Sequence, residues 1–66
     1  MILVTDFDNT LYSRSDPQVL MDNLQVAQIF RQAGNKFILA TGRNASSLGR
    51  VLPDFDEYFD YVILDN

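Results

Sequence analysis

Three short apolar runs limit what this chain can fold into. They occupy residues 2–5, 37–41 and 61–64, and each ends in polar or turn-forming residues. The segments between them carry apolar residues at helical spacing, and the order strand, helix, strand, helix, strand is typical of a parallel α/β sheet. The runs are continuously apolar rather than alternating, which indicates that both faces of the sheet are covered.

The sequence indicates where the two helices expected between the strands begin and end. Asp16 precedes a proline, a pair that is typical of a helix start, and apolar residues then recur until Gly34. We therefore expect one helix over about residues 17–33. A second is expected over roughly residues 44–52, where Pro53 stops it.

This strand order raises a difficulty with the sheet. If consecutive strands are neighbours in space, right-handed crossovers place both helices on the same face. The other face is then bare, although its residues are apolar. We expect that face to be covered by something outside these residues, either the rest of a longer chain or a second copy of this one.

Length and composition narrow the functional classes. A chain of 66 residues forms at most one small domain, and it buries only about 60% of its unfolded surface. It contains neither cysteine nor histidine, so any metal is held by oxygen. Net charge is −4 and the five basic residues are scattered, which argues against a nucleic-acid partner. The apolar start ends at Asp6, too short for a signal peptide or a membrane span, so a cytoplasmic location is expected.

Asp6 and Asp8 stand two residues apart at the carboxyl end of the first predicted strand. Open α/β sheets bind their ligands at that edge. Side chains at such spacing point the same way, about 6.6 Å apart, and two carboxylates there repel each other unless a cation intervenes. Magnesium suits the position, because one or two carboxylates and phosphate oxygens usually hold it. Taken alone, an Asp-x-Asp sequence more often caps a turn.

The residues around these aspartates are more specific. Ile-Leu-Val-Thr-Asp6-Phe-Asp8-Asn9-Thr10-Leu resembles the first motif of the haloacid dehalogenase superfamily. The resemblance implies that Asp6 is phosphorylated, that Asp8 is the general acid and base, and that Thr10 ties down the loop. Asn9 stands where members of one subgroup often have glycine, and asparagine is among the few residues that tolerate a left-handed conformation.

The second apolar run ends in Thr41-Gly42-Arg43, which resembles the second motif of the same superfamily. A hydroxyl and backbone N–H groups at a strand end can bind the transferring phosphoryl group. Arg43 either contacts the substrate or is a solvated arginine in a turn. By itself Thr-Gly-Arg is an ordinary turn sequence. The resemblance to the superfamily is supported because this sequence follows the first motif after one helix and one strand.

The spacing of the two motifs bears on the subgroup. Between Thr10 and Thr41 there is room for one flap, one helix and one strand, so no cap domain is inserted there. Together with Thr-Gly-Arg, this resembles the Cof-type, sugar-phosphate phosphatase subgroup with a late (C2) cap. The resemblance implies a Mg²⁺-dependent phosphatase with an aspartyl-phosphate intermediate, acting on a small phosphorylated metabolite such as a sugar phosphate.

Complete members of the family need two further elements, a lysine or arginine and an acidic pair. Nothing after Thr41 matches them. We therefore expect residues 1–66 to be the truncated N-terminal portion of a three-layer, Rossmann-like hydrolase core, inactive alone. In the family's strand order the first strand is central, so residues 2–5 would form an open edge and the fragment would self-associate.

Two other functions remain open. A receiver-type phosphoacceptor domain would use Asp65, at the end of the third strand, but such domains keep adjacent acidic residues after the first strand. A non-catalytic interaction fragment would keep the fold without the chemistry. Outside the motifs, we expect the acidic stretch 54–60 to be a solvated turn and Lys36 to be an exposed charge.

Overall fold

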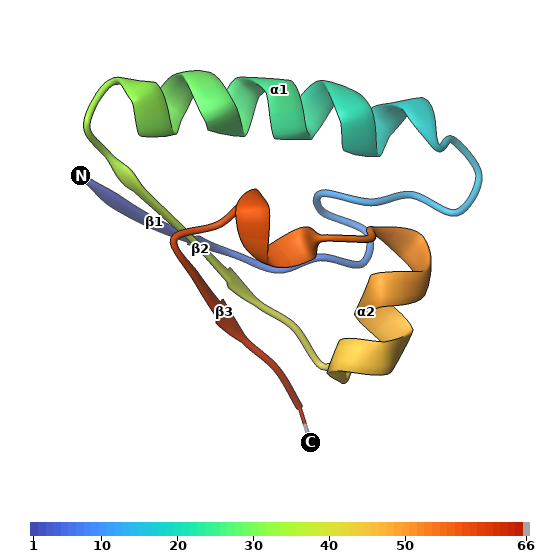
Figure 1. Ribbon diagram of the computed structural model, residues 1–66. Helices are drawn as coiled ribbons and strands as arrows, with labels where there is room; N and C mark the ends of the chain where they lie inside the picture. The colour runs from blue at the N-terminus through green and yellow to red at the C-terminus, as the bar shows by residue number, and fades with distance from the viewer. Residues whose placement is uncertain (66) are drawn as a thin grey trace.

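The computed structural model describes residues 1–65 and has the predicted strand and helix order (Figure 1). Its elements in chain order are β1 (Ile2–Thr5), α1 (Gln18–Gln32), β2 (Lys36–Ala40), α2 (Ala45–Val51), the 3₁₀ helix η1 (Phe55–Glu57) and β3 (Tyr61–Ile63). All strands are parallel in the order β1-β2-β3. The α/β prediction is confirmed, and η1 is an addition to it. Across residues 1–65 there is no helix of the length and apolar character that crossing a membrane requires.

The ends of α1 follow the sequence signals. The Asp16 carboxylate accepts a hydrogen bond from the Gln18 N–H at 3.1 Å, which satisfies one of the free amides at the helix start. At the other end the Gly34 N–H donates to the Arg31 carbonyl at 3.0 Å. Gly34 has φ 92°, a left-handed conformation that glycine adopts at little cost and that turns the chain into β2.

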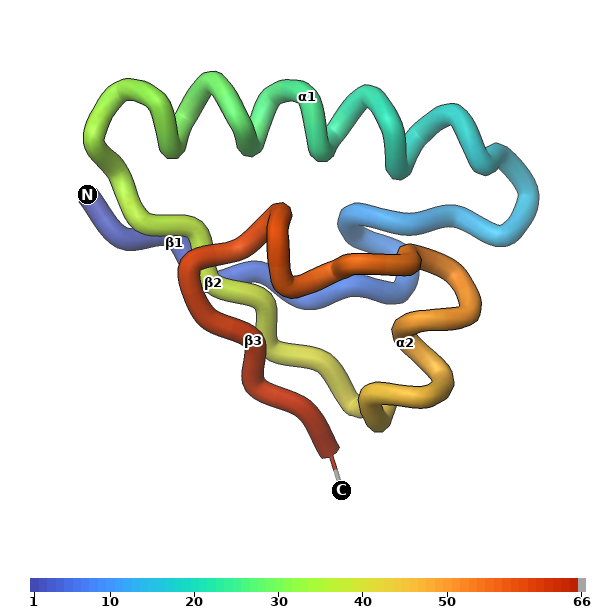
Figure 2. The backbone as a smooth tube through the Cα atoms, in the orientation of Figure 1, coloured from blue at the N-terminus to red at the C-terminus, as the bar shows by residue number. Residues whose placement is uncertain are grey.

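Both helices lie on the same face of the sheet (Figure 2). The strand register aligns Leu3 with Phe37 and Thr5 with Leu39, so these side chains share the helix-covered face. Leu39 is fully buried there, as is Leu48 of α2. The buried core consists of Phe7, Leu11, Leu20, Leu24, Ala27, Phe37, Leu39, Leu48, Leu52 and Phe59.

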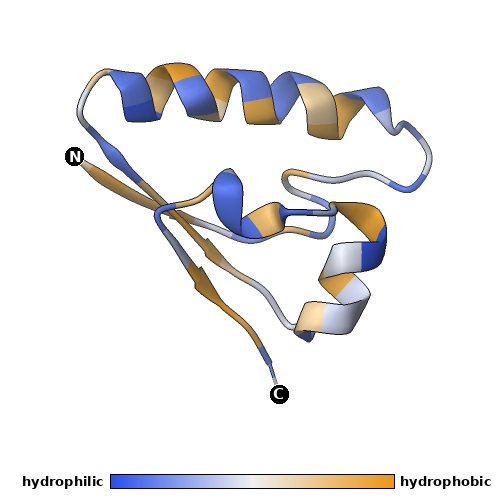
Figure 3. Ribbon diagram, in the orientation of Figure 1, coloured by the Kyte–Doolittle hydropathy of each residue, from blue (hydrophilic) through white to orange (hydrophobic). Residues whose placement is uncertain are grey.

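The opposite face of the sheet is apolar and exposed. Ile2, Val4, Tyr61 and Ile63 are 66%, 56%, 72% and 56% exposed, and the strands that carry them are coloured as hydrophobic in Figure 3. The predicted bare face is therefore confirmed. Residues 1–65 form two of the three layers of a Rossmann-like core, the sheet and one helical layer.

Asp60 corrects the expectation of a solvated acidic turn. Its carboxylate accepts the Phe37 N–H at 2.7 Å and pairs with Arg31 at 3.2 Å, and its own N–H donates to the Phe37 carbonyl at 2.8 Å. These contacts extend the β2–β3 pairing by one residue. The Phe37 N–H, and then Arg31, lower the pKa of the Asp60 carboxyl. The sequence pattern is local and shows no contact between residues 37 and 60.

We expect Asp60→Ala to lower the thermal unfolding midpoint of the 66-residue chain more than Asp56→Ala does. Asp56 is an exposed carboxylate of η1, whereas loss of the Asp60 carboxylate leaves the Phe37 N–H without its partner. The folded pKa of Asp60 lies below the unfolded one, so its contribution is present above the ordinary carboxyl pKa and is lost as the pH falls through the lowered value.

Circular dichroism melts of both variants and the unmutated chain between pH 7 and pH 2 measure this effect. Equal midpoints for the two variants at pH 7 would contradict the structural role of Asp60.

Candidate active site

The loop after β1 is anchored by a buried side chain. Phe7 is 0% exposed, and its carbonyl accepts the N–H groups of Leu11 and Tyr12, each at 3.0 Å. Asn9 has φ 61°, and its N–H donates to the Tyr12 carbonyl at 2.9 Å. The left-handed conformation that asparagine tolerates is therefore used here. Anchoring Phe7 inward leaves the aspartates on either side of it at the surface of the loop.

Thr10 ties this loop to α1 through its main chain. Its N–H donates to the Phe7 carbonyl at 3.3 Å, and its carbonyl accepts from the Asn23 side chain at 3.4 Å. The same Asn23 amide donates to the Leu11 carbonyl at 3.1 Å. Thr10 as a residue is exposed. Any contact of that hydroxyl with a substrate stays a prediction.

The two aspartates have different surroundings. Asp6 is exposed, and one of its carboxylate oxygens accepts the Phe7 N–H at 2.7 Å. Asp8 is held by Arg43 in a bidentate pair, with Nε to Oδ2 at 2.9 Å and Nη2 to Oδ1 at 2.7 Å. The Asp6 carboxylate therefore keeps an oxygen open to a ligand, while the charge of Asp8 is balanced inside the protein.

The second motif lies beside the first. The register pairs Thr5 with Leu39, so the carboxyl ends of β1 and β2 meet at one edge of the sheet. Thr41 is 8% exposed there, and its hydroxyl oxygen accepts the Arg43 N–H at 3.1 Å. A Cβ added at Gly42 would meet nothing within 4 Å, so the space beside that residue is open. The structure thus places both motifs together, as their resemblance to the family implies.

Arg43 is fixed by more than its carboxylate partner. Its Nη1 donates to the Ser47 hydroxyl at 3.1 Å, and its guanidinium carbon lies 5.6 Å from the Phe7 ring centre and 5.8 Å from that of Tyr12. Both distances suit cation–π attraction. The sequence analysis did not predict the Asp8–Arg43 pair or the hydrogen bond from Arg43 to Ser47. The one available signal was that opposite charges follow neighbouring parallel strands.

Arg43 sets the protonation of Asp8. Its hydrogen bonds, with its charge as a smaller cause, lower the pKa of the Asp8 carboxyl, and Asp8 in turn raises the pKa of Arg43. Asp8 in this arrangement is ionised at neutral pH. It can accept a proton from water, but it cannot donate one until the guanidinium moves away.

The carboxylate oxygens of this site are of the type that binds magnesium. Asp6 offers a carboxylate oxygen, and Mg²⁺ is often bound through one or two carboxylates with phosphate oxygens and waters. Asp8 is engaged by Arg43 instead. Among residues 1–65 no three acidic, histidine or cysteine side chains gather into a metal-binding group. Asp6 is thus open to a magnesium ion in this arrangement, and the binding of the same ion by Asp8 stays a prediction.

Replacing Arg43 with glutamine is expected to raise the pKa of Asp8 toward the ordinary carboxyl value, because the bidentate bonds and the positive charge are both lost. NMR titration of the Asp8 side-chain carboxyl carbon measures this change. Arg50→Gln, on the exposed part of α2, removes the same charge away from Asp8 and is the matched control. An unchanged Asp8 pKa in Arg43→Gln would show that the pair does not form in solution.

Comparison with known proteins agrees with this geometry. The model of the haloacid dehalogenase-like hydrolase family matches residues 3–66, almost the whole chain. No curated protein and no solved structure matches it. With both motifs at one sheet edge and the match extending over all three strands, the chain belongs to the haloacid dehalogenase-like hydrolase family.

Proposed function

We propose that these residues form the nucleophile-bearing half of a Mg²⁺-dependent phosphoester hydrolase that works through an aspartyl-phosphate on Asp6. The observation that carries the proposal is the unequal environment of the two aspartates. Asp6 is exposed with an open oxygen, whereas Asp8 is held as a carboxylate by Arg43. Two carboxylates held in different surroundings at one site can take different parts in one reaction.

In the first step an Asp6 oxygen attacks phosphorus, and the bond from phosphorus to the ester oxygen breaks. The leaving oxygen takes a proton from Asp8, which must first be freed from Arg43 and protonated. A bound phosphoryl group offers Arg43 another anion, so substrate binding itself favours that release. Thr41 can donate its hydroxyl proton to a phosphoryl oxygen while its oxygen accepts the Arg43 N–H.

The second step restores Asp6. Water attacks the phosphorus, Asp8 accepts the proton of that water, and the bond between phosphorus and the Asp6 oxygen breaks to release inorganic phosphate. This second part needs Asp8 in its ionised form, which is the form it has beside Arg43 in the structure. Magnesium, when bound, supplies positive charge that offsets the repulsion between Asp6 and the phosphoryl oxygens.

We assign the chain further to the Cof-type subgroup with a late cap, acting on small phosphorylated metabolites such as sugar phosphates. Two features support this assignment. Between Thr10 and Thr41 the structure contains a short flap, α1 and β2, so no cap domain is inserted there. The loop after β2 has the sequence Thr41-Gly42-Arg43, which that subgroup shares.

Asp6→Asn is expected to abolish turnover in a longer polypeptide that carries this chain together with the missing cationic and acidic groups. The amide is nearly isosteric but is a poor nucleophile, so turnover of para-nitrophenyl phosphate should fall by roughly a thousandfold or more. Asp56→Asn changes an equally exposed carboxylate of η1 and serves as the control.

Borohydride trapping locates the phosphorylated residue in the same polypeptide. Reduction converts an aspartyl-phosphate to homoserine, which peptide mass spectrometry identifies. Homoserine at position 6 supports the proposal. Homoserine at position 65 contradicts the proposal and favours the receiver-type alternative. Turnover of Asp6→Asn within about tenfold of the unmutated protein also contradicts the proposal.

The 66-residue chain alone is expected to bind Mg²⁺ weakly and to hydrolyse no phosphoester measurably. In the described part of the chain Arg43 is committed to Asp8, and no third acidic residue joins Asp6 and Asp8. The developing charge of the reaction therefore lacks stabilising partners. Mg²⁺-dependent turnover of para-nitrophenyl phosphate by the purified chain, lost in Asp6→Asn, would show that the site is complete.

A further inference from the structure

The Arg43 guanidinium has contacts that do not involve Asp8. Its Nη1 atom donates to the Ser47 hydroxyl at 3.1 Å and lies 3.5 Å from the Ser47 carbonyl oxygen. Its central carbon lies 5.6 Å from the ring centre of Phe7 and 5.8 Å from that of Tyr12. The bonds to Asp8 use the other edge of the group, Nε and Nη2. Ser47, Phe7 and Tyr12 would therefore still contact the guanidinium if Asp8 left it.

The Ser47 side chain is positioned by the start of α2. The Ser47 N–H donates to the Asn44 side-chain oxygen at 2.9 Å, and the Leu48 N–H donates to the Asn44 carbonyl at 3.0 Å. Leu48 is fully buried, so this turn of the helix cannot shift without disturbing the packing of the core. The Ser47 hydroxyl thus has a defined position before any ligand binds.

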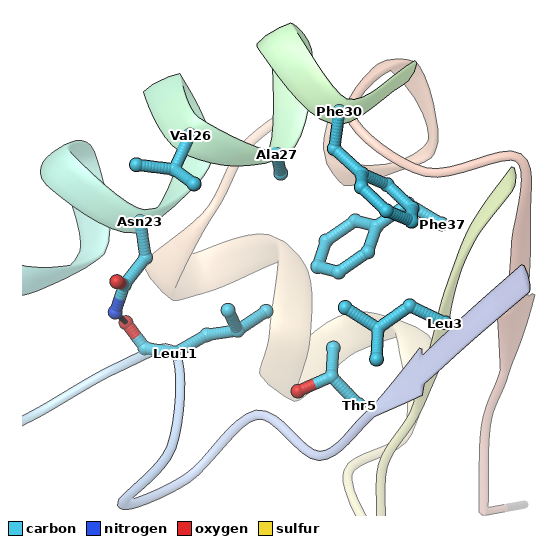
Figure 4. Close-up of a pocket in the computed structure, with 8 residues that line it drawn as sticks. All are labelled: Leu3, Thr5, Leu11, Asn23, Val26, Ala27, Phe30 and Phe37. Carbon is cyan, nitrogen blue, oxygen red and sulfur yellow. Dashed lines mark hydrogen bonds between the residues drawn. The ribbon is translucent and has the colours of Figure 1, made fainter. Parts of the chain in front are cut away.

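The Tyr12 ring is positioned by the loop that carries Asp8. The Tyr12 N–H donates to the Phe7 carbonyl at 3.0 Å, and its ring stacks on the buried Phe7 ring with 5.3 Å between the ring centres. The preceding residue, Leu11, lines the apolar pocket between α1 and β1, and its carbonyl accepts the Asn23 side-chain amide at 3.1 Å (Figure 4). The segment with Tyr12 is therefore attached both to the core and to α1.

Arg43 is the more enclosed partner of the Asp8–Arg43 pair. Its side chain is 22% exposed, whereas the Asp8 side chain is 42% exposed. A short aspartate side chain reorients by rotation about two bonds. Movement of Arg43 would break its hydrogen bond to Ser47 and its contacts with both rings. When the pair opens, Asp8 is therefore the partner expected to move.

We propose that Arg43 is a preorganised anion site, with Ser47 and Tyr12 as its positioning residues. The phosphoryl group of a substrate takes the place of the Asp8 carboxylate on a guanidinium that does not move. Phosphoryl and carboxylate groups both present two oxygens to one guanidinium edge, so the same Nε and Nη2 donors fit either. This inference rests on the phosphoester hydrolysis proposed above and adds which side chain moves and which residues hold the other.

The place of Arg43 in the sheet and the charges involved favour this exchange. The Arg43 N–H donates to the Thr41 hydroxyl oxygen at 3.1 Å, so the candidate phosphoryl-binding hydroxyl belongs to the same short loop. The strand register brings that loop to the sheet edge that carries Asp6. A phosphate monoester carries about 1.5 to 2 negative charges at neutral pH, against one on Asp8, so it competes well for the arginine.

Nitrogen-15 NMR relaxation of the Arg43 Nε–H group in the 66-residue chain tests whether the arginine stays in place. Its signal is assigned by its loss in Arg43→Gln. In Asp8→Ala the order parameter of this group is expected to remain above about 0.6, the level below which a group is flexible. Adding Ser47→Ala or Tyr12→Leu to Asp8→Ala is expected to lower the order parameter below that level.

Two matched variants are the controls for this measurement. Ser46→Ala changes the exposed neighbour of Ser47 on α2, and Tyr61→Leu changes a tyrosine of β3 that is 72% exposed. Combined with Asp8→Ala, neither is expected to alter the Arg43 order parameter. Ser47→Ala removes a single oxygen atom, and circular dichroism verifies that each variant folds.

Calorimetric titration with inorganic phosphate tests the anion site itself, in the longer polypeptide described above. Ser47→Ala and Tyr12→Leu are each expected to weaken phosphate binding at least about fivefold. Ser47→Thr keeps the hydroxyl and Tyr12→Phe keeps the aromatic ring, so both are expected to bind phosphate within about twofold of the unmutated protein. A merely structural effect of these positions would not follow the hydroxyl and the ring in this way.

Three results would overturn the proposal. The first is an Arg43 order parameter below about 0.6 in Asp8→Ala alone, which shows that Asp8 holds the arginine. The second is unchanged phosphate affinity in both Ser47→Ala and Tyr12→Leu. The third is an equal loss of order from Ser46→Ala and Ser47→Ala. Failure of the proposed hydrolysis is a separate result: a polypeptide that meets these expectations but is never phosphorylated on Asp6 retains the anion site without the reaction.

Discussion

Burial of the Phe7 side chain is the constraint on which the site depends. The residue is fully buried between two surface aspartates, and its ring packs against Tyr12 with 5.3 Å between the ring centres. Its carbonyl closes the loop, and its ring supports the Arg43 guanidinium. The same side chain therefore belongs to the hydrophobic core and to the wall of the site. Loop geometry and core packing cannot vary independently here.

The elements were predictable because their signals are local. Apolar runs gave the strands, Asp16 and Gly34 marked the ends of α1, and the crossover rule predicted the bare face. The placement of both motifs at one edge followed from the topology alone. What sequence reasoning missed are contacts between distant residues, the pairing of Asp8 with Arg43 and of Asp60 with Phe37. Such contacts depend on strand register and side-chain direction, which no local pattern records.

The pairing of Asp8 with Arg43 changes how the site is understood. The family motifs account for residue types, but the structure shows a general acid candidate held in its ionised form. Its acidity is then a property of the Arg43 side chain as much as of Asp8. In the proposed reaction, Asp8 can donate a proton only after an anion competes with it for the arginine.

A main-chain hydrogen bond from the Asp65 N–H to the Arg43 carbonyl, at 3.1 Å, connects the segment after β3 to the residue that pairs with Asp8. The Thr41 N–H also donates to the Ile63 carbonyl at 2.9 Å, so two main-chain hydrogen bonds connect the end of β3 with the Thr41–Arg43 loop. Arg43 therefore bonds to the residues after β3 through its main-chain carbonyl and to Asp8 through its guanidinium. The end of the third strand and the loop after the first strand thus both bind Arg43, one through its main chain and the other through its side chain.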